Sequence, residues 1–445
     1  MKNAFTVDSS LISHTGCMAS LRSRLIRGSS SPANIDERGD ISHLLRRTSF
    51  GPFPGQVESL ANRGYAAVLD AVLSAPVAVV VQPQLDATDQ QEALRVWWFE
   101  RMRSVTANDP TAGLHERAVL FWHGHFTSGF DKVDDAAVMW TQHALIRGHA
   151  LGNFRDFVRA VTKDAAMLRY LDGDGSSGDA PNENYSRELM ELFALGRGNY
   201  TETDVRAGAK ALSGWYVDDA GVGRFDESSH FDGMVTYLGR SGTLSADDVV
   251  DAVCDHRACA GFIVGKLHSH FVGEAPSDKR RAELAEIFRS EKLELRPVVD
   301  AILRHDTFRR ARYNRPRLPV ELVVATSAVL ALDGVAARDL YRSAADLGQE
   351  LFDPPNVAGW PGGQRWINTG NTIMRCGQAV DLCFRDDARL TSSTVDEVLL
   401  RCGIFEPTKA TRAGLLAVAS RVPDDRERAA VLLALALSSP EFALA

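Results

Sequence analysis

Apolar residues recur at intervals of three and four along most of the chain, and this spacing constrains the fold more than any other feature. In stretches of three or four helical turns, apolar side chains stand at i, i+3, i+4 and i+7, and glycine or proline closes the stretch. This pattern predicts amphipathic helices that each bury one face. The clearest stretches are residues 54–73, 90–105, 113–126, 134–151, 153–171, 182–196, 245–256, 259–271, 278–290, 296–305 and 318–332.

Signals for β-strands are few. Only GRFDES (residues 223–228) and MVTYLG (234–239) read as extended pieces, and no self-similar repeat of 30 to 45 residues indicates a solenoid. We therefore expect an all-α fold: a large multi-helical single domain with long irregular loops and little or no β structure. Residues 1–38 lack a helical period and predict a flexible N-terminal lead-in, and residues 39–445 predict the helical domain.

Composition and charge exclude several classes of protein. The chain has 445 residues, of which 45% are hydrophobic and 24% charged, as in ordinary globular proteins. The net charge is −8 and no long Lys/Arg cluster occurs, which argues against nucleic acid as a partner. No apolar run approaches the ~18 residues that a membrane span needs. The first residues do not read as a signal peptide, so we expect a cytoplasmic protein.

The six cysteines include no CxxC pair of the kind that zinc prefers. We expect them to be reduced or simply buried. The alternative is a bridge between Cys254 and Cys259, which lie five positions apart.

The stretch NENYSREL concentrates polar side chains at the start of one predicted helix. Asn184, Glu188 and Glu191 fall on one face with Arg187 beside them, and Tyr185 lies on the apolar face. One interpretation is a solvated face, with Arg187 paired to a glutamate four residues away. The other is a site, because carboxylates and amides together supply acid–base groups and hydrogen bonds. A Thr201–Asp204 capping box predicts that the next helix follows directly.

The segment FWHGHFTSGFDK places His123 and His125 two residues apart. On a continuous helix these side chains would diverge by roughly 200°, so they can share a ligand only if the chain leaves the helix at Gly124. We weigh a structural or hydrogen-bonding role, a zinc or iron site completed by carboxylates, and acid–base work.

The segment FDPPNVAGWPGGQRWIN (residues 352–368) predicts a long loop. Trp360 and Trp366 either anchor it to the helical body or line a binding pocket, with Asn368 as a nearby polar group. In HLLRRTSFGP, the adjacent Arg46 and Arg47 meet carbonyls and carboxylates or clamp a substrate anion. Lys266 is a charge within an apolar helix and is either snorkelling or paired with a buried acid.

Together these segments resemble a known family. HLLRRTSFGP, FWHGHFTSG, PNENYSRELMELFALG, YTETDVRAGAKALSGW, CAGFIVGKLHSHFVG and FDPPNVAGWPGGQRWIN are similar, in unchanged order from about residue 39 onward, to the bacterial DUF1800 family. The resemblance implies a large helical domain, often found in exported proteins and often encoded beside a partner of the sulfatase-like DUF1501 family. It implies no settled activity.

Our sequence-based hypothesis is a hydrolase or group-transfer enzyme acting on a polar substrate, for example a carbohydrate. The alternative is a non-catalytic helical adaptor that docks a DUF1501-type partner. No phosphate loop, dinucleotide fingerprint or nucleophile elbow is present. The candidate catalytic residues are Glu183, Glu188, His125 and Arg187; the candidate substrate-binding residues are Asn182, Asn184, Trp360, Trp366 and Asn368; the candidate ligands for a divalent metal are His123, His125 and Glu191.

Overall fold

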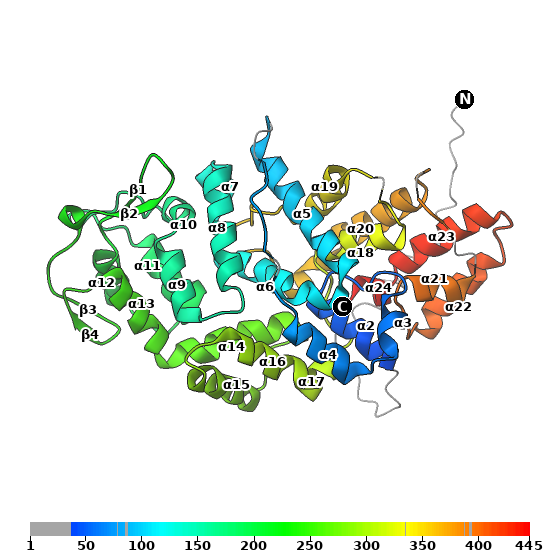
Figure 1. The fold of residues 1–445 in the computed structure, drawn as a ribbon, viewed down its shortest axis with the longest axis horizontal. Coiled ribbons are helices and arrows are strands. Elements are labelled where there is room, and N and C mark those ends of the chain that lie inside the picture. Colours follow the sequence, from blue (N-terminus) through cyan, green and yellow to red (C-terminus); the bar gives the residue numbers. More distant parts are fainter. Residues whose placement is uncertain (1–36, 78, 85–87, 334, 387, 391–393) are drawn as a thin grey trace.

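The computed structural model describes residues 37–77, 79–84, 88–333, 335–386, 388–390 and 394–445. Helices make up nearly all of its regular structure, which confirms the predicted all-α class (Figure 1). The first half contains α2 (Glu37–Thr48), α3 (Gln56–Ala61), α4 (Tyr65–Ser74), α5 (Gln90–Asn108), η2 (Pro110–Gly113), α6 (Leu114–His123), α7 (Phe130–Val133), α8 (Ala136–His149), α9 (Phe154–Thr162), α10 (Ala165–Tyr170), α11 (Asn184–Glu188), the π-helix η3 (Leu189–Ala194) and α12 (Glu202–Ala211).

The second half begins with a short 3₁₀ turn and continues as helices to the end. It contains η4 (Glu227–Ser229), α13 (Ala246–Asp255), α14 (Arg257–Val272), α15 (Asp278–Ser290), α16 (Leu295–Arg304), α17 (Asp306–Arg310), α18 (Pro319–Val329), α19 (Ala337–Asp346), η5 (Gly363–Trp366), α20 (Thr369–Cys383), α21 (Val395–Arg401), α22 (Lys409–Ala419), α23 (Asp425–Leu437) and α24 (Pro440–Ala443).

The described residues form two small antiparallel hairpins. Strand β1 (Trp215–Val217) pairs with β2 (Gly223–Phe225), and β3 (Val235–Tyr237) pairs with β4 (Arg240–Gly242). The two predicted extended pieces contain β2 and β3, which confirms them. Their partners, β1 and β4, were not predicted, and all four strands span only three residues each.

The elements from the middle of the sequence lie at one end of the molecule, as Figure 1 shows. That end holds α9 to α13 and both hairpins, the opposite end holds α21 to α23, and α2, α5 and α6 lie between them. Segments far apart in sequence meet there: α2 packs against α14 and α17, and a β-bridge joins Pro316 to Leu444.

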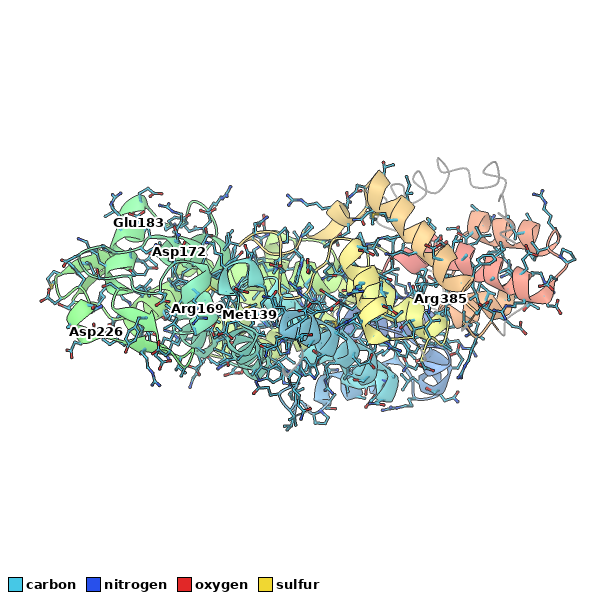
Figure 2. All side chains as sticks on the ribbon, turned by 90° about the horizontal axis from the view of Figure 1, so that it is seen from above. Met139, Arg169, Asp172, Glu183, Asp226 and Arg385 are labelled. Carbon is cyan, nitrogen blue, oxygen red and sulfur yellow. The ribbon has the colours of Figure 1, made fainter. Side chains whose placement is uncertain are left out.

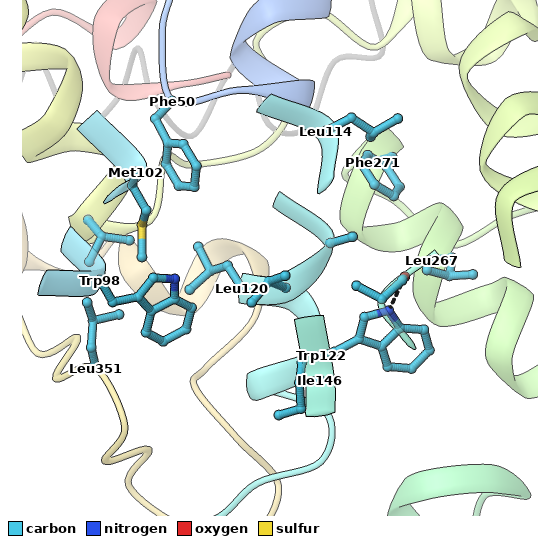
Figure 3. Close-up of a cluster of buried hydrophobic side chains, with 14 of the residues drawn as sticks. Phe50, Trp98, Met102, Leu114, Leu120, Trp122, Ile146, Leu267, Phe271 and Leu351 are labelled. Carbon is cyan, nitrogen blue, oxygen red and sulfur yellow. Dashed lines mark hydrogen bonds between the residues drawn. The ribbon is translucent and has the colours of Figure 1, made fainter. Parts of the chain in front are cut away.

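One continuous cluster of buried apolar side chains runs from Ile41 to Phe442. Figure 3 shows part of it, with Trp98 of α5, Trp122 of α6 and Phe271 of α14 among the buried side chains. The indole Nε1 of Trp122 donates a hydrogen bond to Ala150 O at 2.8 Å, so its polar atom is satisfied inside the core.

Two predicted helical stretches are interrupted. Residues 54–73 split between Ala61, where α3 ends, and Gly64, whose φ of 77° suits glycine and which is the N-cap of α4. Residues 153–171 split at Asp164, whose carboxylate accepts a hydrogen bond from Met167 N and so caps α10. The predicted capping box of Thr201 and Asp204 is confirmed at the start of α12.

Three further predictions concern the N-terminal segment, a cysteine bridge and membrane spans. The lead-in at residues 1–38 lies almost wholly outside the described residues, which begin at Glu37. Cys254 and Cys259 are buried free thiols, so the alternative of a bridge between them is wrong. No helix in the described ranges has both the length and the apolar character to cross a bilayer.

Candidate functional site

The turn after α6 is the centre of the candidate site. Helix α6 ends at His123, and Gly124 caps it, so the chain leaves the helix where the sequence analysis required. The two imidazoles nevertheless point to different partners. His123 Nε2 lies 2.9 Å from Nδ1 of His143 on α8, whereas His125 Nε2 lies 2.8 Å from Phe193 O on the π-helix. The turn therefore contacts two separate parts of the core.

The same turn contacts the long loop at residues 352–368. A Cβ added to Gly359, whose φ is +86°, would lie 2.0 Å from Gly124 O. On the other side, a Cβ on Gly124 would lie 3.3 Å from Cε3 of Trp360. The two backbones approach this closely because neither glycine has a side chain. The indole Nε1 of Trp360 donates to Glu350 O at 3.2 Å, which fixes the ring against the turn.

The NENYSREL segment also meets the turn, through its second half. After the five α-helical residues of α11 the chain widens into the π-helix η3, a departure from the continuous α-helix that the spacing predicts. Near the end of η3 the carbonyls of Leu192 and Phe193 accept hydrogen bonds from side chains of other segments: Lys266 Nζ binds the first at 2.9 Å and His125 Nε2 the second. The turn thus joins the loop to η3.

Lys266 and His125 form a buried pair beside these carbonyls. Lys266 Nζ lies 3.1 Å from His125 Nδ1, and because Nε2 faces a carbonyl and must donate, Nδ1 is the acceptor. Burial lowers the pKa of Lys266 to about 8. Burial and the neighbouring ammonium hold the pKa of His125 well below its usual value. Lys266 therefore contacts the carbonyl of Leu192 and the imidazole of His125. Both alternatives from the sequence, a snorkelling side chain and a pair with a buried acid, are wrong.

The polar side chains at the beginning of NENYSREL form ion pairs and hydrogen bonds with one another and with neighbouring segments. Arg187 Nη2 binds Glu183 Oε2 at 3.1 Å, four residues before it, and both Arg187 Nη atoms bind Glu202. Asn182 Oδ1 accepts from the backbone N of Asn184, whose Nδ2 donates to Asp172 Oδ2 at 2.8 Å. In Figure 2, Asp172 and Glu183 lie at the same end of the molecule, far from Arg385.

Two glutamates of this helix have contrasting surroundings. Glu191 accepts a hydrogen bond from Tyr200 Oη at 2.5 Å and pairs with Arg197 Nε at 2.6 Å, and both contacts lower its pKa. Glu188 is half-buried, and no described residue donates a hydrogen bond to its carboxylate or forms an ion pair with it. Burial and then the charge of Glu191 raise its pKa. A raised pKa without a partner marks a carboxyl that can exchange a proton.

Further carboxylates gather near Glu188 around Tyr170. Burial raises the pKa of Tyr170 to about 12, and the charges of Asp131, Asp353 and Glu188 add to the rise. A Cβ on Gly129 would lie 2.6 Å from Asp131 Oδ1 and 2.9 Å from Asp353 Oδ1, so both carboxylates reach the same point. We call Asp131, Tyr170, Glu188 and Asp353 the carboxylate group.

Arg95 of α5 holds one member of the carboxylate group in place. Its Nη2 lies 3.2 Å from Asp353 Oδ2, its Nη1 lies 3.1 Å from Glu350 Oε1, and its Nε donates to Leu351 O. Burial raises the pKa of Asp353 despite this cation, and the charge of Arg95 opposes the rise. The site therefore holds two half-buried carboxyls with raised pKa values.

The three candidate metal ligands do not come together. His125 uses both ring nitrogens on Phe193 O and Lys266, His123 faces His143, and Glu191 is held by Tyr200 and Arg197. Among the residues that the structure describes, no group of three or more His, Cys, Asp and Glu side chains has an arrangement that could hold a metal ion. The side chains predicted as metal ligands therefore form separate hydrogen bonds and ion pairs instead.

Two of the loop residues proposed for substrate binding lie in a different place from Trp360. Trp366 is buried and lines a small pocket of about 20 Å³ with Ile367, Arg375 and Ser438. Asn368 accepts a hydrogen bond from Asn371 N and caps α20. Asn182 lines a second pocket of similar size beside Tyr185, whose hydroxyl is 2.8 Å from Thr162 Oγ1.

Sequence reasoning missed the aspartates of the carboxylate group and their cation. Asp131 and Asp353 lie in segments that the sequence analysis quoted, FDK and FDPP, but only the histidines, the tryptophans and Asn368 of those segments were named as candidates. Listing every ionisable side chain within each segment would have found both. Tyr170 and Arg95 carry no such signal, because only the fold brings α10 and α5 to this point.

Comparisons with known proteins identify a family. The model of DUF1800, described as a protein of unknown function, matches residues 43–444. Searches among curated proteins and among solved structures gave no match.

Proposed function

The chain belongs to the DUF1800 family, whose name assigns no activity, and from the site itself we propose a hydrolase or group-transfer enzyme that uses paired carboxyls on a polar substrate. The observation that carries the proposal is Glu188: a half-buried carboxyl with a raised pKa and no partner among the described residues. The charges of Glu188 and Asp353 both raise the pKa of Tyr170, and the pKa of Asp353 is itself raised.

Glu188 acts as the general acid in this proposal. A carboxyl whose pKa is raised keeps its proton closer to neutral pH and can give it to a leaving group. Asp353, ion-paired with Arg95, is the complementary base that activates water or an acceptor hydroxyl. Asp131 is exposed and offers a further acceptor for the hydroxyl groups of substrates such as carbohydrates, while Tyr170 is buried beneath the carboxylates.

This assignment changes the roles suggested by the sequence. Glu183 and Arg187 neutralise each other and Glu202, and His125 holds the end of η3, so we propose that these three position the helix. Trp360 fixes the loop that carries Asp353.

A matched pair of variants tests the proposal. A panel of chromogenic glycosides and esters is assayed with wild type, Glu188→Gln and Glu183→Gln, each checked for an unchanged thermal midpoint. We expect Glu188→Gln to lose roughly a hundredfold or more of turnover, the usual scale for removing a general acid, and Glu183→Gln to keep most of it. Turnover that survives Glu188→Gln, or no turnover by wild type on any member of the panel, refutes the proposal.

The adaptor hypothesis has a separate observation in its favour. Helix α20 and its C-cap residue Phe384 expose the apolar side chains of Ile373, Met374, Val380 and Phe384, with exposed fractions between 38% and 51%. Ile373, Val380 and Phe384 are separated by seven and four residues, which places them along one side of the helix, as at a helix-docking surface. If a DUF1501-type partner binds this side of the helix, the two proteins co-elute on size exclusion, and Phe384→Glu abolishes the co-elution while Glu188→Gln does not.

A further inference from the structure

A buried group of arginines with too little negative charge lies away from the carboxylate group. Arg47, Arg117, Arg315 and Arg317 are at most 5% exposed, and Arg375 lies partly buried beside them. They come from α2, α6, the segment before α18, and α20, so the fold assembles them from across the sequence. We call these five residues the arginine cluster.

Glu321 is the shared carboxylate of the arginine cluster. It pairs with Arg117 and binds Arg315 Nη2 at 2.9 Å, and its pKa is lowered to about 2 by these cations, against the effect of burial. Within the described residues, Arg47, Arg317 and Arg375 form no ion pair. A single carboxylate thus stands against five guanidinium groups in a largely dry region, where an unpaired charge costs several kcal/mol.

Several N–H groups of the cluster have no acceptor. The buried nitrogens without a hydrogen-bond partner include Nε and Nη1 of Arg47, Nε and Nη2 of Arg117, and Nε of Arg315, Arg317 and Arg375. Buried donors in folded proteins are normally paired with protein or with a bound species. Arg46 is better satisfied: its Nη atoms donate to three backbone carbonyls, those of Gly403, Glu441 and Leu444, although its Nε also lacks an acceptor.

A small pocket adjoins the cluster. Arg375 and Leu322, the neighbour of Glu321, line the pocket of about 20 Å³ that also contains Trp366. Arg375 Nη2 donates to Arg317 O at 3.0 Å, which ties the pocket wall to the cluster. Trp366 is 3% exposed and its Nε1 has no acceptor, so a second unpaired donor belongs to the same pocket.

We propose that the arginine cluster and the adjoining pocket bind a small inorganic anion, with Arg375 and the Trp366 Nε1–H as donors at the pocket. The guanidinium groups supply the charge, and their fixed N–H groups match chloride or the oxygens of phosphate. The pocket volume is suited to a small ion and excludes a large ligand.

The test is a titration of the purified full chain with sodium phosphate or sodium chloride, with ionic strength held constant by sodium HEPES. We expect the thermal midpoint to rise and saturate with one of the two probes, because an ion that binds the native state stabilises it by mass action. Saturation with phosphate identifies an oxyanion site, and saturation with chloride a halide site.

Conservative variants separate specific binding from a general salt effect. Trp366→Phe removes the indole N–H and keeps an aromatic, though smaller, side chain, so the half-saturating concentration rises roughly tenfold. Trp360→Phe is the matched control, since its indole donates to Glu350 O instead, and it leaves the half-saturating concentration unchanged. Arg375→Gln provides a second variant at the edge of the fold and weakens binding further.

A midpoint that rises linearly with either salt, equally in all variants, overturns the proposal. In that case, carboxylates of the chain itself neutralise the arginines and no ion enters from solution. Saturable binding with the same half-saturating concentration in Trp366→Phe and wild type also overturns it, because the pocket would not be the site.

Discussion

Substituting alanine for Gly359 should break the contact between the turn after α6 and the long loop. The structure gives two separate costs. Gly359 has φ of +86°, a region where a residue with a Cβ loses about 1–2 kcal/mol. Its Cβ would also lie 2.0 Å from Gly124 O, a backbone atom that cannot swing away, and such overpacking costs about 1–3 kcal/mol. The expected loss in free energy of unfolding is therefore about 2–5 kcal/mol.

Two glycines of the same loop separate these costs. Gly363 has φ of +57° but nothing within 4 Å of its Cβ position, so Gly363→Ala should show the backbone cost alone. Gly362 has φ of −93° and open space, so Gly362→Ala should change stability by less than about 0.5 kcal/mol. Unfolding of the three variants by urea, followed by tryptophan fluorescence, gives the ranking. If Gly359→Ala is no less stable than Gly363→Ala, the turn and the loop do not touch as described.

Three further predictions concern single side chains. Burial raises the pKa of Asp164 to about 7, above its usual 3.8, so the stability that this group contributes is full at low pH and is lost as pH rises through 7. Asp164→Asn, which can still cap α10, should flatten the fall of the thermal midpoint between about pH 4 and pH 7, and an unchanged slope would assign that fall to other groups. Arg187→Ala should cost less than about 1 kcal/mol in urea unfolding, because its two ion pairs are substantially exposed, and a larger loss would contradict the solvated arrangement. Thr201→Ala removes the N-cap of α12 and should cost about 1 kcal/mol by the same assay, with Thr201→Ser close to wild type; equal losses in both would show that the cap hydroxyl is not the cause.

Local sequence signals predicted the features that depend on residues close together in the chain. Helix positions followed from the spacing of apolar side chains, and the capping box at Thr201 from four residues. The break at Gly64 was not predicted, although a glycine with positive φ is its local cause. The π-helix after Glu188 was not predicted either, because its partners come from other segments. A π-helix needs partners for its displaced carbonyls, and these are Lys266 and His125, from distant parts of the chain.

The candidate site divides in the same way. The NENYSREL segment and the loop at residues 352–368 both contact the turn after α6. Few of the candidate residues within these segments lie in one common site. Spacing alone gave His123 and His125 as a pair, whereas the end of α6 at Gly124 sends one to His143 and the other to Phe193. Glu188 was chosen for its helix face. Arg187 and Arg197 lie near it, but they form their ion pairs with Glu183 and Glu191, and this distinguishes Glu188 from those two glutamates.

The sequence by itself determined the family, the all-α class and the approximate position of most helices, because helical period and end signals act over a few residues. Only the tertiary structure decided which charges are neutralised and which are not. Asp353 meets Arg95 and Arg117 meets Glu321 across large separations in sequence, whereas Arg47, Arg317 and Arg375 lie nearby without an ion pair among the described residues. The pKa of a carboxyl or a guanidinium depends on burial and on charges a few ångströms away, and these distances exist only once the chain has folded.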